Sequence, residues 1–166
     1  MKKTFLVALL AVSLFACKNT SDKTGTTDAT TSTSSCVKEG PEVDLLKKAL
    51  TAYSTGDWAT MASCFSDTAL SYHNADSVGM KMSDRIELFK KHRESIEGTI
   101  DIGKPNFEVV TVASSDEKYK DYKWGHVWVM FTAKSKAGVT KKTATFASFA
   151  IRNGKIDWEQ VIYDTK

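Results

Sequence analysis

The stretch Leu46–Ala69, LKKALTAYSTGDWATMASCFSDTA, contains the signals that decide the fold. The apolar residues leading into it follow the spacing of one helical stripe: Val43, Leu46, Leu50 and Tyr53. Gly56 predicts the end of this first helix, because glycine readily adopts the left-handed conformation of a helix stop. Asp57 then predicts the cap of a short second helix, which ends at the Ser66-Asp67 turn.

The rest of the chain indicates one more helix and then a run of strands. We expect a third helix from a Ser83 cap to Gly98, with Ile86, Phe89 and Ile96 on its inner face. Strands are expected at 68–73, 107–113, 123–133, 141–152 and 155–163. Asn153-Gly154 is a strong hairpin signal between the last two of them. Helices followed by antiparallel strands predict an α+β domain, with the helices on one face of the sheet.

The motifs of Leu46–Ala69, together with Asn153-Gly154-Lys155-Ile156 and the ending Tyr163-Asp164, resemble the NTF2-like superfamily. That superfamily includes SnoaL-like proteins and ketosteroid isomerases. The resemblance covers nearly all of the domain that we place at 43–166. It implies a cone of three N-terminal helices packed on a curved, mostly antiparallel sheet. Since this fold hosts enzymes, binding proteins and dimerisation modules alike, it does not by itself specify a function.

The resemblance also allows a test of steroid-type isomerisation. Those enzymes use a tyrosine on the first helix and a protonated aspartate on a late strand as hydrogen-bond donors to an oxyanion, with an aspartate base at the end of the first strand. The corresponding positions here are Ala49, Ala147 and His73. Alanine side chains donate no hydrogen bond, so we expect that the protein is not a ketosteroid isomerase.

The N-terminus is typical of a secretion signal. Lys2 and Lys3 precede an apolar run that is shorter than the roughly 20 residues a membrane-spanning helix needs. Leu14-Phe15-Ala16-Cys17 resembles the lipobox of bacterial lipoproteins, with Phe15 as its least typical member. The resemblance implies that residues 1–16 are removed and that Cys17 receives acyl chains, palmitate among them, which bind the lipid bilayer. An ordinary secretion signal with an incidental cysteine is the alternative.

Residues 17–42 are expected to be a lipidated cysteine and a flexible tether. Eleven of the eighteen residues 18–35 are Ser or Thr, and such a segment buries too little apolar surface to order itself. By resemblance to known sorting signals, Lys18 permits transfer to the outer membrane of a diderm bacterium. The residues after Cys17 form no acidic cluster of the kind that marks surface export in some bacteria, which favours the periplasmic side.

Charge and cysteine usage exclude several classes of function. The net charge of +3 falls to +1 without Lys2 and Lys3, so no nucleic-acid partner is expected. The sequence shows no metal-ligand spacing and no phosphate loop, and we expect neither a metal nor a cofactor. A Cys36–Cys64 disulfide is an alternative to the simpler interpretation of Cys64 as a free, buried residue.

His73 is the candidate catalytic residue, because histidine accepts and donates protons near neutral pH. Tyr72 and Asp76 are close to it in the sequence. His126 and Trp128 share one face of a strand, where an aromatic row either lines a ligand pocket or packs against other structure. By the resemblance, Glu159 and Tyr163 point inward on the last strand. A buried carboxylate is costly unless it is paired or protonated, so Glu159 near His73 or His126 would mark a functional site.

These observations leave several functions open. The first is a non-enzymatic module of the cell envelope that binds a small apolar molecule or a protein. The second is a cofactor-free enzyme of the SnoaL-like kind, an isomerase, cyclase or hydrolase using His73 as acid or base. The third is an assembly factor working through its surface. We also expect a homodimer through the outer face of the sheet, because residues 127–131 are apolar on both faces and helices cover only one.

Overall fold

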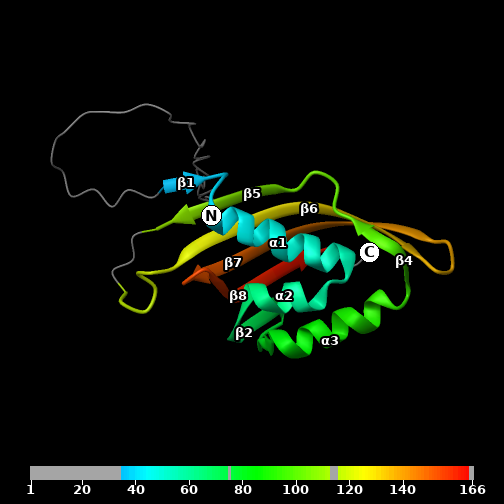
Figure 1. Ribbon diagram of the computed structural model, residues 1–166, viewed down its shortest axis with the longest axis horizontal. Coiled ribbons are helices and arrows are strands. Elements are labelled where there is room, and N and C mark those ends of the chain that lie inside the picture. The colour runs from blue at the N-terminus through cyan, green and yellow to red at the C-terminus, as the bar shows by residue number, and fades with distance from the viewer. Residues whose placement is uncertain (1–34, 75, 113–115, 165–166) are drawn as a thin grey trace, which may run out of the picture.

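The computed structural model describes residues 35–74, 76–112 and 116–164, and has three helices on one face of an eight-stranded sheet (Figure 1). The helices are α1 (Pro41–Thr55), α2 (Trp58–Cys64) and α3 (Met82–Arg93). Most strands follow the helices in the chain, as the sequence predicted. The α+β class and the cone of helices on a curved sheet are confirmed.

The sheet runs in the order β1-β5-β6-β7-β8-β2-β3, with β4 pairing to β6 beside β5. Its strands are β1 (Ser35–Val37), β2 (Phe65–His73), β3 (Met80–Lys81), β4 (Ile96–Asp101), β5 (Asn106–Thr111), β6 (Lys123–Ser135), β7 (Thr140–Arg152) and β8 (Lys155–Tyr163). Among the described strands only β2 and β8 pair in parallel. This parallel contact joins the helical half of the chain to its end, and it positions the candidate site described below.

The signals around Gly56 act as the sequence predicted. Gly56 adopts a left-handed φ of 77°, and its N–H points to the carbonyl groups of Ala52 and Tyr53 at the end of α1. The side chain of Asp57 accepts a hydrogen bond of 3.0 Å from the N–H of Thr60 and so caps α2. These two residues therefore end α1 and begin α2 within two positions of the chain.

The expectation for the third helix was wrong at both ends. Lys81 occupies the N-cap of α3, so Ser83 lies inside the helix. The helix ends at Arg93, and Ile96 begins β4, where it pairs with Ser135 of β6. Gly98 has a φ of 65° at an irregularity of this pairing, not at a helix end. Pairing with a long strand overrides the local helical spacing here.

The predicted tether was also too long at its C-terminal end. Ser35–Val37 forms β1, an edge strand antiparallel to β5, with Cys36 opposite Val110. The signal segment 1–16, Cys17 and residues 18–34 lie outside the described residues. No helix of the described part of the chain is long and apolar enough to cross a membrane.

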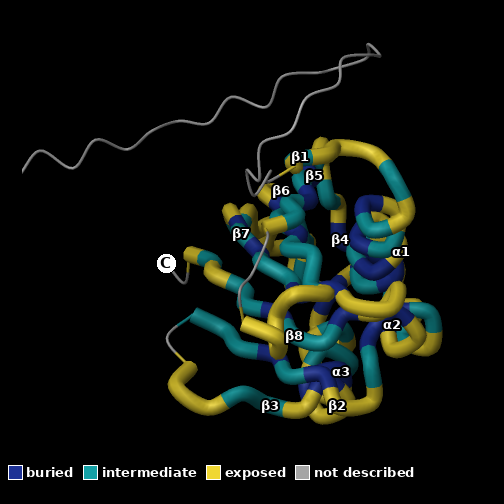
Figure 2. The backbone as a smooth tube through the Cα atoms, turned by 90° about the vertical axis from the view of Figure 1, so that its left-hand side faces the viewer, coloured by how far each residue is buried: buried dark blue, intermediate teal, exposed yellow. Residues whose placement is uncertain are grey.

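The core lies between the helices and the sheet, where Figure 2 shows buried positions gathered. Val43 and Leu46 of α1 face Val109 of β5 and Val127 of β6, all at most 2% exposed. Gly125 of β6 permits the close approach of α1, since a Cβ there would lie 2.6 Å from Leu46 Cδ1. Cys64 is free and buried, which rules out the Cys36–Cys64 disulfide.

Candidate functional site

A cavity of about 660 Å³ lies between the helices and the concave face of the sheet. Apolar and aromatic side chains form most of its walls. From the helices these include Leu46, Ala49, Tyr53 and Phe89, and from the sheet Val127, Val129, Phe131, Ala147 and Phe149. Ala49 and Ala147 carry no hydrogen-bonding side-chain group, so the oxyanion donors of a steroid isomerase are missing at both positions.

Polar side chains meet at one end of this cavity, where β2 and β8 run in parallel. Ser71 pairs in register with Glu159, and its hydroxyl donates a hydrogen bond of 2.6 Å to Oε1 of that carboxylate. His73 follows two residues later on the same inward face, with Nε2 at 3.6 Å from Glu159 Oε1. Ser71 is 0% exposed and Glu159 is 4% exposed, so this carboxylate is inside the fold.

Arg85 of α3 completes the polar end from the helical side. Its Nε donates to Ser71 Oγ at 3.2 Å, and its Nη2 donates to Asp76 Oδ2 at 3.0 Å. The same Asp76 oxygen accepts a 3.0 Å hydrogen bond from the backbone N–H of His73. This N–H, and then the Arg85 guanidinium, hold the pKa of Asp76 below its usual value. The connected residues are therefore Glu159, Ser71, Arg85, Asp76 and His73.

Aromatic rings surround His73. Its imidazole centroid lies 5.7 Å from the ring centroids of both Phe89 and Tyr163. Tyr53 packs edge-on against Phe89 at 5.1 Å and against Phe131 at 5.4 Å. Burial raises the pKa of the Tyr53 phenol, and the Glu159 carboxylate adds to this rise. Tyr53 therefore stays a neutral hydroxyl on the cavity wall at neutral pH.

The arrangement has one group suited to proton transfer. His73 Nε2 is buried and has no hydrogen-bond partner among the described residues. An imidazole nitrogen in that state can accept a proton from a bound molecule, and a carboxylate at 3.6 Å stabilises the imidazolium that forms. No group of three or more His, Cys, Asp or Glu side chains suited to a metal ion occurs within the described ranges.

The structure does not bring all the candidate residues to the cavity. Of the seven proposed for catalysis or ligand binding, His73, Glu159 and Tyr163 line it. Asp76 lies outside, 43% of its side chain exposed, and acts on the site only through Arg85 and the His73 backbone. Tyr72 points to the opposite face of the sheet, where its ring lies 5.9 Å from that of Trp158.

His126 and Trp128 also occupy that opposite face, which we call the outer face of the sheet. The His126 ring stacks on Phe146 at 5.8 Å, and burial lowers the pKa of this histidine. The aromatic row on β6 does not line the cavity, because α1 packs on the other side of the strand. Trp128 lines a shallow depression on this outer face instead, and the ligand-binding role of the two residues stays a prediction.

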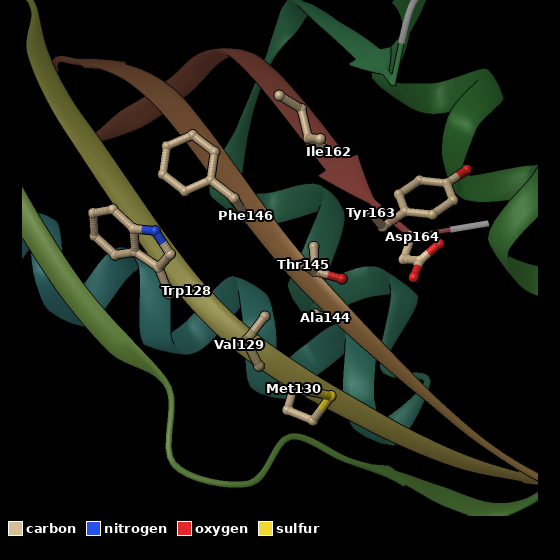
Figure 3. Close-up of a pocket in the computed structure, with 9 residues that line it drawn as sticks. All are labelled: Trp128, Val129, Met130, Ala144, Thr145, Phe146, Ile162, Tyr163 and Asp164. Carbon is tan, nitrogen blue, oxygen red and sulfur yellow. The ribbon is translucent and has the colours of Figure 1, made fainter. Parts of the chain in front are cut away.

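The outer face carries an exposed apolar patch. Trp128 of β6, Phe146 of β7 and Ile162 of β8 are neighbours in register and surround a shallow depression with Met130 (Figure 3). Trp128 is 44% exposed, Met130 46% and Ile162 49%. Large apolar side chains gathered in this way are typical of an interaction surface.

The sequence reasoning missed Ser71 and Arg85. Arg85 stands three residues after Met82 and one before Ile86, on the stripe of α3 that faces inward. An arginine on a buried stripe requires an acceptor inside, and that signal was available. Ser71 gave a weaker signal, because small polar residues occur on either face of a strand.

No protein family model matches the sequence, and no curated protein sequence does either. Solved structures do match. A Xanthomonas campestris protein of unknown function with a cystatin-like fold is 25% identical, with a TM-score of 0.53 over 73% of this chain and 88% of that one. An NTF2-like protein from Burkholderia xenovorans is 15% identical, with a TM-score of 0.54 over 75% and 90%. A hypothetical protein from Catenulispora acidiphila with a ketosteroid isomerase-like fold, solved with trimethylamine, is 11% identical, with a TM-score of 0.54 over 74% and 86%.

These likenesses show the NTF2-like fold that the sequence motifs had indicated. Solved structures with this fold also include a putative polyketide cyclase and an LEH-like epoxide hydrolase, at 13% and 11% identity. Such low identities transfer the fold and no activity. The function has to be argued from this chain's own cavity.

Proposed function

We propose that the domain binds a small, mostly apolar molecule with one polar end inside the cavity. The observation that supports this is the asymmetry of the walls: apolar and aromatic side chains form most of them, and the polar side chains that contact one another gather at the His73–Glu159 end. Ligand sites in proteins have about this composition and volumes of roughly 300–1,000 Å³. The alanines at positions 49 and 147 support the proposal, because they leave space where larger side chains would fill it.

A cavity-filling variant tests this proposal. Ala147→Phe places a ring in the cavity, whereas Ala144→Phe, on the same strand, adds the same ring to the exposed outer face. We expect the first change to abolish binding of a neutral apolar dye such as Nile red, and the second to leave it unchanged. Equal binding by both variants would place the dye elsewhere and contradict the proposal.

Native mass spectrometry identifies the natural ligand. The full chain carrying Cys17→Ser, purified from its own host, is expected to retain a molecule of low mass that Ala147→Phe lacks. The same spectrum reports the oligomeric state. A spectrum without bound mass in both proteins would remove the support for a resident ligand.

We propose, further, that the domain works in the cell envelope as a lipoprotein. The lipobox at Leu14–Cys17 and the Ser/Thr-rich segment after it support an anchor in the outer membrane, on the periplasmic side. Two acyl chains or more give stable anchoring, whereas one gives only marginal binding. A tethered binding domain there would meet ligands passing through the periplasm.

A cofactor-free enzyme using His73 is the second candidate. The buried, unpartnered Nε2 of His73 beside the Glu159 carboxylate favours it. If His73 is catalytic, His73→Ala abolishes turnover of the ligand found in the cavity and leaves the melting temperature nearly unchanged. If His73 is structural, the same change lowers the stability and leaves any turnover in place.

A further inference from the structure

Charged side chains lie at the polar end of the cavity and at its rim. Arg85 and Asp76 form an ion pair at 3.0 Å and cancel one another. Lys141 and Asp164 line the exposed rim with opposite charges. The Glu159 carboxyl group then remains as the one buried acid of the cavity among the described residues, and the group that can pair with it is His73, at 3.6 Å and charged only when protonated.

The hydrogen bonds of Glu159 do not satisfy it. The Ser71 hydroxyl and the His73 imidazole both approach Oε1, the first at 2.6 Å and the second at 3.6 Å. The longer distance exceeds that of a hydrogen bond. Oε2 accepts no hydrogen bond from the described residues. An ionised carboxylate buried among apolar side chains with one neutral donor is expensive, and a cation beside it offsets that cost.

Arg85 forms no hydrogen bond or ion pair with Glu159 in the described part of the chain. It directs Nε to Ser71 and Nη2 to Asp76. His73 lies between Phe89 and Tyr163, with Nε2 on the Oε1 side. A positive group that reaches Oε2 therefore has to come from the bound molecule.

The walls near Glu159 suit a cation as well. Phe89 and Tyr163 lie beside His73, and Tyr53 lies close enough for the carboxylate to act on its phenol. The faces of aromatic rings attract ammonium groups, by about 2 kcal/mol when the cation is desolvated. Anionic ligands meet the opposite situation, because Glu159 repels them and Arg85 is already paired.

We propose that the molecule bound in the cavity is an organic amine, with its protonated nitrogen at Glu159 and an apolar alkyl or aryl body along the aromatic walls. This inference rests on the proposed binding function and specifies its ligand class. Ser71 and Arg85 are positioning residues: Ser71 holds Glu159 Oε1 by its hydrogen bond, and Arg85 holds the Ser71 hydroxyl.

The test uses probes that share one skeleton and differ in charge: 4-phenylbutylammonium, the neutral 4-phenylbutanol and the anionic 5-phenylpentanoate. Their binding to the Cys17→Ser full chain is measured by calorimetry at neutral pH. We expect the amine to bind about tenfold more tightly than the alcohol, or better, at the lower end of what desolvated charge pairs contribute. Equal affinities, or a preference for the carboxylate, would overturn the amine assignment and leave the binding function intact.

A pair of variants locates the charge. Glu159→Gln removes the cavity carboxylate, and Glu108→Gln removes the charge of a carboxylate on the outer face, where Glu108 pairs with Lys38 at 3.4 Å. We expect Glu159→Gln to lower amine affinity to that of the alcohol without changing alcohol binding, and Glu108→Gln to change neither. An unchanged amine affinity in a folded Glu159→Gln protein would refute the inference. If none of the three probes binds the unmodified cavity, the proposed function itself fails.

Discussion

Replacing Ser71 tests whether its hydrogen bonds stabilise the polar end of the cavity. Its hydroxyl is fully buried, donates to Glu159 Oε1 and accepts from Arg85 Nε. Ser71→Ala removes both contacts and leaves a buried carboxylate oxygen and a buried guanidinium N–H without a partner. Hydrogen bonds to charged groups contribute about 1.5–3 kcal/mol each, and water entering the cavity restores part of that loss. We therefore expect the free energy of unfolding to fall by about 3 kcal/mol.

The same strand supplies a matched control. Ser66 is also on β2, and its buried Oγ has no hydrogen-bond partner among the described residues. Ser66→Ala removes the same atom without breaking a contact, so we expect a change within about 0.5 kcal/mol. The two variants thus separate loss of the network from loss of a hydroxyl.

Urea denaturation, with linear extrapolation and an unchanged slope, measures both effects. In thermal unfolding, about 3 kcal/mol corresponds to a drop of roughly 10 °C for a domain of this size. Equal stability of Ser71→Ala and Ser66→Ala would refute the reasoning, because it would mean that the hydrogen bonds of Ser71 contribute nothing net.

Three further predictions concern the anchor, the outer face and the acid response. Cys17→Ser is expected to abolish palmitate labelling and membrane association, and equal labelling of both proteins would exclude the lipobox. The untethered domain is expected to sediment as a homodimer that pairs through the outer face. Trp128→Glu should then give monomers, whereas the control Glu97→Gln, at an exposed charge on β4, should leave the dimer intact. A natural domain that sediments as a monomer would contradict this. Because the folded state lowers the pKa of Asp76, its contribution to stability is present above about pH 4 and is lost as the pH falls through the lowered value, so Asp76→Asn should flatten the acid side of a stability profile.

The elements that the sequence predicted well depend on local signals. Gly56 ended α1 because a left-handed residue is needed there, and Asp57 capped α2 through its own side chain. The Asn153-Gly154 turn, with φ of 52° and 70°, fixed the hairpin of β7 and β8. Each of these features needs only residues that are neighbours in the chain.

The predictions that were wrong concern segments whose structure depends on strands far away in the chain. Residues 94–98 continue a helical spacing, yet Ile96 and Glu97 pair with Ser135 and Lys134, about forty positions away in the chain. Similarly, residues 35–37 have a composition typical of a tether, but they form a strand that pairs with β5. Neither partner can be identified from local composition.

Strand periodicity predicts two faces but does not say which one the helices cover. His126 and Trp128 alternate with Val127 and Val129, and both sets are apolar enough to be inside. The close fit of Leu46 over Gly125 places α1 on the side of Val127. Consequently the aromatic row faces away from the cavity, and the residue pair best suited to chemistry is His73 and Glu159.

The inward position of Glu159 followed from the resemblance to NTF2-like proteins and not from any pattern in the strand. In physical terms the position is unfavourable, since apolar residues would fill the same volume at lower cost. Ser71, Arg85 and Asp76 together act to keep that carboxylate in place, although none of them would be needed if position 159 were leucine. Natural sequences depart from the simplest core mainly at functional sites. Glu159→Leu removes the buried carboxylate and leaves only the Ser71 hydroxyl without its acceptor. We therefore expect it to lose less stability than Ser71→Ala and to lose amine binding. A Glu159→Leu protein less stable than Ser71→Ala would show that the carboxylate serves the fold instead.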